Sequence, residues 1–372
     1  MTGILTFHWA DDYGAMLQAY ALKTCLESLT KEKVEVIPYA PVKLTGRYWL
    51  FPVVGDERGR KIRYFLRYRG LIRNVSRLRG FLRRRKNMRG FRQLYLTREP
   101  EIRKADRLSL KKYSCVFVGS DQVWNPEITV GLDDAYMGKV KEKVKCRLIA
   151  YGASFGKDSL PARYHAPFEK AVNENFSGIS MREKSAVPFV KQFYHGNVTD
   201  VLDPTLLLEQ SAWQKIAKMP EQKNYILFIY TEYNELMMQY LQELSVELKK
   251  RVIQLSMPQP GQREDWIDLE IEGGPSEFIG FFQNADCVVT NSFHGMVFSV
   301  LMEKQFIVFS HSNKNARIDN LMEKLELKSR LAEGGRMPEK DEMLKEIDWK
   351  HVRRLIEKER GLSVEFIKSM LS

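Results

Sequence analysis

Residues 3–41 read GILTFHWADDYGAMLQAYALKTCLESLTKEKVEVIPYAP. The apolar run GILTFHW predicts a buried strand, and the polar ADDYG that follows predicts a loop. AMLQAYALKTCLESL has the apolar spacing of a helix, and VEVIPYAP predicts a second strand. A strand, a helix and a strand in this order form a βαβ unit, whose two strands run parallel. The stretch therefore predicts a parallel α/β sheet.

The same alternation continues along the chain and restarts once. In the first half, further strands are predicted within KYSCVFVGSDQVW, CRLIAYGASFG and FSGISMREKSAVPFVKQF. A second series of strands and helices begins after Asp203-Pro204, which stops one element before the next opens. Uninterrupted apolar strands of this kind are typical of parallel sheets buried on both faces. We therefore predict an α/β protein with two Rossmann-like, doubly wound domains facing a cleft.

We place the N-terminal domain at residues 1–190, with a basic helical insert at about 43–110. The C-terminal domain is placed at 191–372, and its trailing helices are expected to pack back on the first domain. Ligands of doubly wound sheets bind at the carboxyl ends of the strands, so the cleft between the domains is the predicted ligand site.

Positive charge is concentrated in one segment. The chain carries a net charge of +12, but residues 43–98 contain eighteen Lys and Arg and two acids, so the remainder sums to about −4. Within 58–98, apolar residues recur at spacings of three and four, which predicts a basic amphipathic helix or a pair of helices, with Gly70, Gly80 and Gly90 as candidate breaks. Such a helix suits an anionic membrane surface, and a solvated helical face gives the same pattern. It lacks a nucleic-acid reading motif, so we predict no nucleic-acid partner.

Several classes of protein are excluded by what the sequence lacks. No uncharged apolar run approaches the roughly 18 to 20 residues of a membrane span, so we expect a cytoplasmic protein that docks on the inner face of the membrane at most. The first strand is not followed by G-x-G-x-x-G, and GASFGKD at 152–158 lacks the spacing and the Ser or Thr of a P-loop. His8, Asp11 and Asp12 are residue types that can bind a metal, but acids in a polar loop beside a strand are commoner. We expect no metal and no cofactor.

The loop TNSFHG, residues 290–295, lies between the strand DCVVT and the helix MVFSVLMEK. A helix amino terminus capped by small polar residues exposes backbone N–H groups, so Asn291, Ser292 and Gly295 predict an anion site. His294 can donate to a phosphate or transfer a proton. Asn and Ser are also ordinary helix caps and a lone histidine can be structural, so both interpretations stay open.

Three basic side chains follow other predicted strands. Arg182 comes after GISM, where its guanidinium can bind a carboxylate or phosphate with two parallel hydrogen bonds. Lys314 and Arg317 follow QFIVFS and offer a second cationic pair. Salt bridges of Arg182 with Glu183 and of Arg317 with Asp319 are the structural alternatives.

A carboxylate, an aromatic ring and an amide follow the strand CVFVGS. They are Asp121, Trp124 and Asn125. These groups are the ones that sugar-binding sites use, and Asp121 can act as a general base on a hydroxyl. A turn carboxylate and a tryptophan in the domain core are the alternative interpretation.

Taken in order, these segments resemble the polysaccharide pyruvyl transferase family. The resemblance rests on ILTFHWADDYGAMLQAYAL, VFVGSDQVWNP, IAYGASFG, ISMREKSA, DPTLLL and TNSFHGMVFSVL followed by KNARIDNLMEKLEL, which together span roughly residues 3–330. It implies two Rossmann-like domains of the GT-B type. It also implies transfer of the enolpyruvyl group of phosphoenolpyruvate to a sugar of a cell-surface or exopolysaccharide repeat unit, giving a pyruvate ketal and phosphate.

The resemblance also implies roles for particular residues. Phosphoenolpyruvate would bind Arg182, Lys314, Arg317 and the Asn291–Gly295 loop, and a free or lipid-linked sugar would bind Asp12, Tyr13, Trp124 and Asn125. The catalytic residues would be Arg182, His294, which contacts phosphate or protonates the methylene carbon, and Asp121, which deprotonates a hydroxyl. Asp12 stands where the family usually has asparagine, which adds a charge to that loop.

A nucleotide-sugar glycosyltransferase of the same architecture is the alternative. A diphosphate would also favour a helix amino terminus and an arginine. The identity of the donor separates the two reactions.

Overall fold

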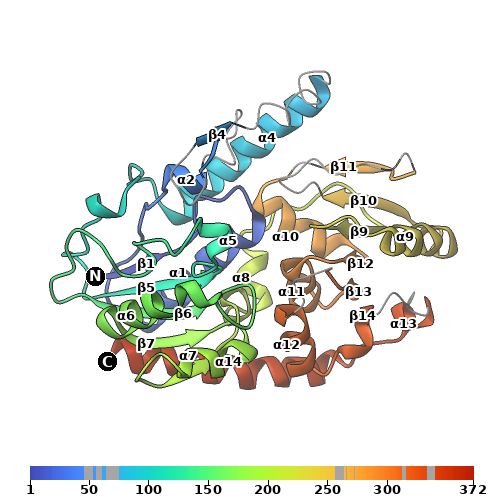
Figure 1. The fold of residues 1–372 in the computed structure, drawn as a ribbon. Coiled ribbons are helices and arrows are strands. Elements are labelled where there is room, and N and C mark those ends of the chain that lie inside the picture. The colour runs from blue at the N-terminus through green and yellow to red at the C-terminus, as the bar shows by residue number, and fades with distance from the viewer. Residues whose placement is uncertain are drawn as a thin grey trace. The chain divides into compact units, whose positions relative to one another are not determined.

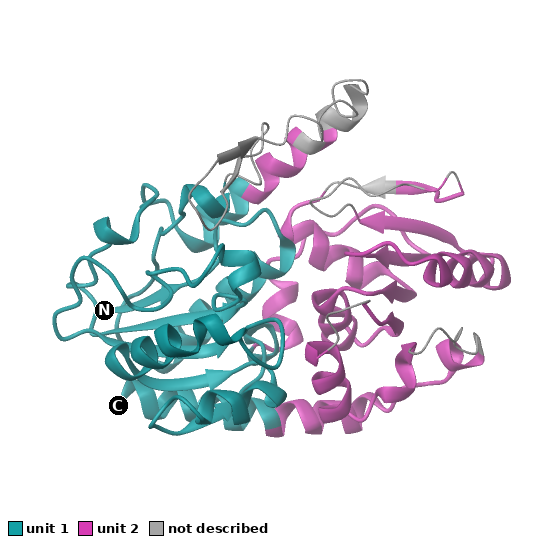
Figure 2. Ribbon diagram, in the orientation of Figure 1, with its two compact units in different colours: residues 1–79, 89–207, 359–372 teal, residues 80–88, 208–358 magenta. Residues whose placement is uncertain are grey.

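The computed structural model describes residues 1–45, 53–55, 61–63, 75–255, 264, 266–271, 273–311, 316–332 and 340–372. The chain divides into two compact units, which Figure 2 distinguishes by colour. Unit 1 comprises Met1–Arg79, Arg89–Leu207 and Glu359–Ser372, and unit 2 comprises Gly80–Met88 and Leu208–Lys358. Each unit is built on its own parallel six-stranded sheet, as predicted.

The sheet of unit 1 has the order β2-β1-β5-β6-β7-β8 (Figure 1). Its strands are β1 (Thr2–Leu5), β2 (Val34–Val36), β5 (Cys115–Asp121), β6 (Arg147–Ala153), β7 (Phe176–Met181) and β8 (Val198–Asp200). The helices that connect them include α1 (Tyr13–Leu29), α5 (Pro126–Thr129), α6 (His165–Asn175) and α7 (Val187–Lys191). The order reverses between β1 and β5, and such a switch point is where doubly wound sheets bind ligands.

The sheet of unit 2 has the order β11-β10-β9-β12-β13-β14. Its strands are β9 (Tyr225–Ile229), β10 (Arg251–Leu255), β11 (Leu269–Ile271), β12 (Cys287–Thr290), β13 (Gln305–Phe309) and β14 (Leu331–Ala332). Its helices include α8 (Gln210–Gln214), α9 (Glu235–Leu248), α10 (Pro275–Asn284), α11 (Phe293–Leu301), α12 (Ala316–Lys324) and α13 (Lys340–Leu344). Counted along the unit this is the Rossmann order 3-2-1-4-5-6, with its switch point between β9 and β12.

Apolar strands form the buried centre of both sheets, as the sequence pattern predicts. Every residue of β1, β9 and β12 is buried. Helix α1 begins at Tyr13 because the Asp12 carboxylate caps it, accepting the backbone N–H of Ala15 at 2.9 Å. The loops after the strands are thereby held on rigid elements.

Unit 1 continues past residue 190, the boundary predicted from sequence. Strand β8 pairs with β7 through Val198 and its neighbours, and the chain stays with this sheet to Leu207. Helix α14 (Trp349–Leu371) ends in unit 1 as well. There the Ser363 hydroxyl accepts the backbone N–H of Leu202 at 2.9 Å, and Ile367 is fully buried.

The predicted basic helix differs from the structure in two ways. Val53–Gly55 (β3) and Lys61–Arg63 (β4) form an antiparallel strand pair. Helix α4 (Val75–Phe91) runs through Gly80 and Gly90, so the predicted breaks at these glycines are wrong. A glycine inside a helix costs only about 1 kcal/mol, which a helix of 17 residues absorbs. Gly70 lies outside the described residues.

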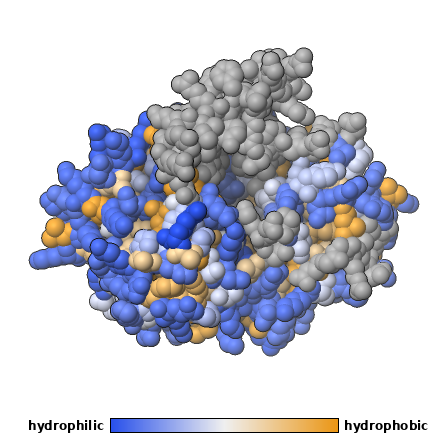
Figure 3. Space-filling view, viewed as in Figure 1, coloured by the Kyte–Doolittle hydropathy of each residue, from blue (hydrophilic) through white to orange (hydrophobic). Residues whose placement is uncertain are grey.

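The face shown in Figure 3 is largely hydrophilic where the structure describes it, and its hydrophobic residues form small groups. No helix among the described residues is long and apolar enough to cross a membrane.

Candidate active site

The loops that follow β1 and β5 are tied together at the switch point of unit 1. The buried Thr6 hydroxyl donates to the Ser120 carbonyl at 3.1 Å and accepts from Gln18 Nε2 at 2.8 Å. Arg92 also binds the loop after β1, donating to the carbonyls of His8 at 3.0 Å and Trp9 at 2.7 Å. An arginine of the basic segment therefore shapes the first loop of the site.

His8 is buried within this loop. Its Nδ1 lies 3.2 Å from the Thr6 carbonyl, which can only accept, so Nδ1 carries the proton. Burial, reinforced by the charge of Arg92, lowers the pKa of His8 to about 3. The ring is therefore neutral near pH 7. Within the part of the chain that the structure describes, Nε2 has no hydrogen-bond partner.

Most of the residues predicted to bind the acceptor sugar are buried or cap helices. Tyr13 is 1% exposed and Trp124 is fully buried, with its ring stacked 6.0 Å from Phe155 and its indole N–H donating to the Tyr136 carbonyl. Asn125 caps α5 by accepting the backbone N–H of Glu127. Neither Tyr13 nor Trp124 has a ring face exposed for stacking on a sugar. Trp124 packs in the domain core, as the alternative interpretation predicts. Asp12 is half-buried and caps α1.

Asp121 ends β5 in a conformation that few residues adopt. Its φ is 76°, in the left-handed region that costs non-glycine residues energy and that recurs at functional sites. Its Oδ1 accepts the backbone N–H of Gln122 at 2.8 Å and lies 3.5 Å from Arg182 Nη2. The carboxylate is thus fixed in direction and retains 14% side-chain exposure.

Arg182 lies buried among three carboxylates. Its guanidinium is 3.0 Å from Asp203, 3.5 Å from Asp121 and 3.9 Å from Glu183, and its side chain is 2% exposed. Burial works to lower the pKa of Arg182, but the three carboxylates outweigh it and raise the pKa. Arg182 is therefore a charged partner of acidic groups rather than a cation open to a substrate. Its predicted salt bridge with Glu183 is present within this larger cluster.

In unit 2 the loop 290–295 forms the helix amino terminus predicted from sequence. Ser292 caps α11, and its hydroxyl accepts the backbone N–H of Gly295 at 3.3 Å. A Cβ at Gly295 would lie 2.4 Å from the Thr290 hydroxyl oxygen, so only glycine fits. The Thr290 hydroxyl in turn donates to the Ile229 carbonyl at 2.6 Å. The loop is therefore rigid and joined to the neighbouring strand.

Asn291 links the two strands that flank the switch point of unit 2. Its side-chain oxygen accepts the backbone N–H of Thr231 at 2.8 Å, and its Nδ2 donates to the Glu232 carbonyl at 2.6 Å. The residue is fully buried. Asn291 therefore organises the loop after β9, a role that sequence analysis did not assign to it.

His294 and Arg317 both contact the ring of Phe293. The two ring centroids of Phe293 and His294 lie 5.1 Å apart, and the Arg317 guanidinium lies 5.2 Å from the Phe293 centroid. His294 is half-buried. The structure thus brings two of the predicted donor-binding residues to the amino end of α11, as expected for an anion site. Lys314 lies outside the described residues.

Sequence analysis missed Thr231, Glu232 and His311, which lie at the same edge of the unit 2 sheet. His311 Nδ1 is 2.7 Å from a Glu232 carboxylate oxygen, and His311 Nε2 is 2.7 Å from the Thr231 hydroxyl. The signal available in the sequence is position, because Thr231 and Glu232 follow strand β9 and His311 follows β13, the strand that also precedes Lys314 and Arg317.

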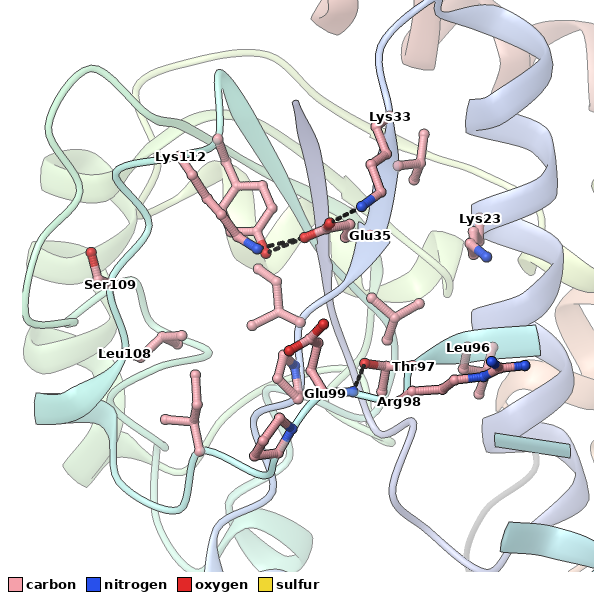
Figure 4. Close-up of a pocket in the computed structure, with 17 residues that line it drawn as sticks. Lys23, Lys33, Glu35, Leu96, Thr97, Arg98, Glu99, Leu108, Ser109 and Lys112 are labelled. Atoms are coloured by element: carbon pink, nitrogen blue, oxygen red, sulfur yellow. Dashed lines mark hydrogen bonds and ion pairs between the residues drawn. The ribbon is translucent and has the colours of Figure 1, made fainter. Parts of the chain in front are cut away.

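A pocket of about 340 Å³ lies elsewhere in unit 1, beside edge strand β2 (Figure 4). Three of its charged groups pair with one another. Glu35 lies 2.6 Å from Lys112 Nζ and 2.7 Å from Lys33 Nζ. Burial raises the pKa of Glu35, but the two lysines prevail and lower it to about 2. The pocket contains none of the predicted site residues. In the described parts of the chain, no three His, Cys, Asp or Glu side chains are grouped to hold a metal ion.

Two parallel sheets with polar clusters at the carboxyl edge of each switch point define a two-unit α/β protein of the Rossmann type. Within that class the chain belongs to the polysaccharide pyruvyl transferase family, whose model matches residues 12–313. The match spans all of the predicted site residues except Lys314 and Arg317. No curated protein matches the chain in sequence.

Solved structures with similar folds are distant in sequence. UDP-N-acetylglucosamine 2-epimerase from Rickettsia bellii is 12% identical, with 100% of this chain and 95% of that chain covered and a TM-score of 0.48. The UDP-GlcNAc 2-epimerase of Methanocaldococcus jannaschii is 11% identical, with 100% and 98% covered and a TM-score of 0.45. UGT89C1 of Arabidopsis thaliana is 12% identical, with 99% and 98% covered and a TM-score of 0.45.

Proposed function

We propose that this protein transfers the enolpyruvyl group of phosphoenolpyruvate to two hydroxyls of a sugar in a surface polysaccharide repeat unit, forming a pyruvate ketal and releasing phosphate. Membership in the polysaccharide pyruvyl transferase family supports the reaction class. The observation that carries the proposal is the grouping of His294 and Arg317 around Phe293 at the capped amino terminus of α11.

Phosphoenolpyruvate carries a phosphate and a carboxylate, and unit 2 offers partners for both. The first backbone N–H groups of α11 and its dipole favour an anion. Arg317 supplies a permanent positive charge beside them. The role proposed for His294 is to donate to the phosphate or to protonate the methylene carbon. This chemistry requires no metal or nucleotide.

In unit 1 we propose that Asp121 accepts a proton from an acceptor hydroxyl. Arg182 then has a positioning role, because its guanidinium contacts both Asp121 and Asp203. Arg317 keeps its predicted donor-binding role, and we propose none for Arg182. Asp12 and Asn125 remain candidates for acceptor contacts, whereas Tyr13 and Trp124 serve the core.

The donor is tested by thermal unfolding of the purified protein with phosphoenolpyruvate, UDP and CMP. We expect stabilisation by phosphoenolpyruvate alone, since a ligand stabilises the state that it binds. Arg317→Ala removes a charge-assisted contact of about 1.5–3 kcal/mol and should weaken binding about 10- to 100-fold. Arg354→Ala, which removes an exposed arginine of α14, is the matched control. Stabilisation by a nucleotide instead would contradict the proposal and favour a nucleotide-sugar glycosyltransferase.

We further propose that the basic segment 58–98 docks on an anionic inner membrane leaflet, where lipid-linked sugars would serve as acceptors. Arg83, Lys86 and Arg89 are exposed on helix α4, and α4 has no acidic residue. Basic residues near an anionic membrane contribute about 1 kcal/mol each.

A further inference from the structure

The carboxyl ends of β9, β12 and β13 bring together a hydroxyl, an imidazole and a carboxylate. The strands are neighbours in register, with Thr290 paired to Ile229 on one side and to Val308 on the other. Thr231 and Glu232 follow β9, and His311 follows β13. The side chains therefore converge across the switch point, at the same edge as His294.

The hydrogen bonds select one tautomer of the neutral His311 ring. The Glu232 carboxylate 2.7 Å away accepts from Nδ1, so the neutral ring has its lone pair on Nε2. The Thr231 hydroxyl, also 2.7 Å away, then donates to Nε2. Asn291 lies 3.5 Å from the same hydroxyl and is the weaker acceptor. A carboxylate that orients an imidazole toward a hydroxyl is an arrangement for proton transfer.

Of these three residues, Thr231 is the one whose hydroxyl is open to solvent. Thr231 is exposed, whereas the His311 side chain is 15% exposed. The Thr231 oxygen donates its one proton to Nε2 and keeps lone pairs that can accept from a substrate hydroxyl. The Asn291 contact to the Thr231 backbone N–H holds the loop in place.

We propose that Glu232, His311 and Thr231 form a proton relay for the second half of ketal formation. The inference rests on the proposed transfer from phosphoenolpyruvate. In the first half, one sugar oxygen bonds to C2, the proton of that hydroxyl goes to the general base, and His294 gives the methylene carbon the proton that makes it a methyl group. The phosphate stays attached to C2 in the adduct.

In the second half, the other sugar hydroxyl gives its proton to Thr231, whose own proton passes to His311 Nε2. The sugar oxygen bonds to C2 while the bond from C2 to the phosphate oxygen breaks, and the electron pair leaves with phosphate. Glu232 stabilises the imidazolium that forms. His311 then returns its proton to the departing phosphate, so the relay ends as it began.

The two halves are separable by experiment, because only the first exchanges protons at the methylene carbon and only the second releases phosphate. The enzyme is incubated in D2O with phosphoenolpyruvate and a panel of methyl pyranosides that carry free diols. Deuterium in recovered phosphoenolpyruvate is measured by NMR, and phosphate by a coupled assay. His311→Ala should lower phosphate release at least ~100-fold and leave deuterium incorporation at or above the wild-type rate.

Further variants separate proton transfer from a structural role. Added imidazole should partly restore phosphate release in His311→Ala, and Glu232→Gln should show a smaller loss with deuterium incorporation retained. His351→Ala is the matched control, since His351 forms another His–Glu pair in unit 2, with Glu326 at 2.9 Å. It should behave like the wild type. Thermal unfolding with phosphoenolpyruvate verifies that each variant folds and binds the donor.

Other outcomes would overturn the proposal in distinguishable ways. Wild-type phosphate release by His311→Ala would remove the relay and leave the proposed function standing. Loss of both deuterium incorporation and phosphate release, with donor binding intact, would move His311 to the first half. A wild-type enzyme that neither exchanges nor releases phosphate with any diol would overturn the proposed function itself.

Discussion

At the scale of single residues, burial decides which polar side chains are available for chemistry. Arg182 forms ion pairs with three carboxylates, and Asn291 forms hydrogen bonds with the backbone of the loop after β9. His311 and Arg317 keep partial exposure at the edge of the unit 2 sheet. Residue type and position after a strand therefore identify candidate site residues. Which of these candidates can reach a substrate depends on the residues that surround each one in the folded protein.

His8 gives a prediction at this scale. Its pKa in the folded protein is about 3 against an ordinary value of 6.5. Between these values the unfolded chain binds a proton that the folded chain does not, so stability falls as the pH is lowered from 6.5 toward 3. Relative to His8→Gln, the wild type should lose about 1.4 kcal/mol of unfolding free energy per pH unit in this window.

Urea denaturation at a series of pH values measures this difference. His195→Gln replaces an exposed histidine and should keep the wild-type pH dependence. Parallel curves for the wild type and His8→Gln would show that His8 titrates alike in both states.

At the scale of elements, the strand-loop-helix transitions carry the site. Helix α11 begins where Ser292 caps it and where only glycine fits at Gly295, so its amino terminus is fixed against β12. Asp121 is likewise fixed in position, because it is the last residue of β5. Helix α4 differs in its surface, since Arg83, Lys86 and Arg89 are exposed on it and it has no acidic residue.

Helix α4 supplies a prediction on membrane docking. Arg83→Ala combined with Lys86→Ala removes two exposed charges and should weaken binding to anionic liposomes by about 2 kcal/mol, or ~30-fold, at low salt. Flotation with anionic and with neutral liposomes measures the binding. The control combines Lys139→Ala with Lys191→Ala, which removes two exposed charges outside α4, in unit 1. Equal retention of both double variants would contradict docking through α4.

At the scale of the whole molecule, the chain's last residues complete the first unit rather than the second. In addition to the Ser363 contact, Arg360 donates to the Leu206 carbonyl at 2.9 Å, and the Phe366 ring lies 6.3 Å from Tyr151. Met370 lies so close to Gly178 that a Cβ there would meet its sulfur. The stability of the β6–β8 sheet region therefore depends on residues far away in sequence.

Ile367→Ala tests this dependence. Ile367 is fully buried, so its truncation should cost about 2–5 kcal/mol, most of it felt in unit 1. Hydrogen exchange should rise in peptides that cover β6 and β7 and stay unchanged in those that cover β9 and β12. Leu362→Ala alters a residue of the same helix that is 54% exposed and should have little effect. Faster exchange confined to unit 2 would refute the assignment.

The sequence by itself determined the two parallel sheets, because each strand is a short apolar run and period and turn chemistry are local properties. It also located the loop 290–295, since a helix cap is readable within a few residues. Only the tertiary structure decided that Arg182 faces Asp121 and Asp203, and that His311 meets Glu232 and Thr231. These partners lie 21 to 80 positions apart in sequence, and strand order, which local sequence does not encode, brings them together.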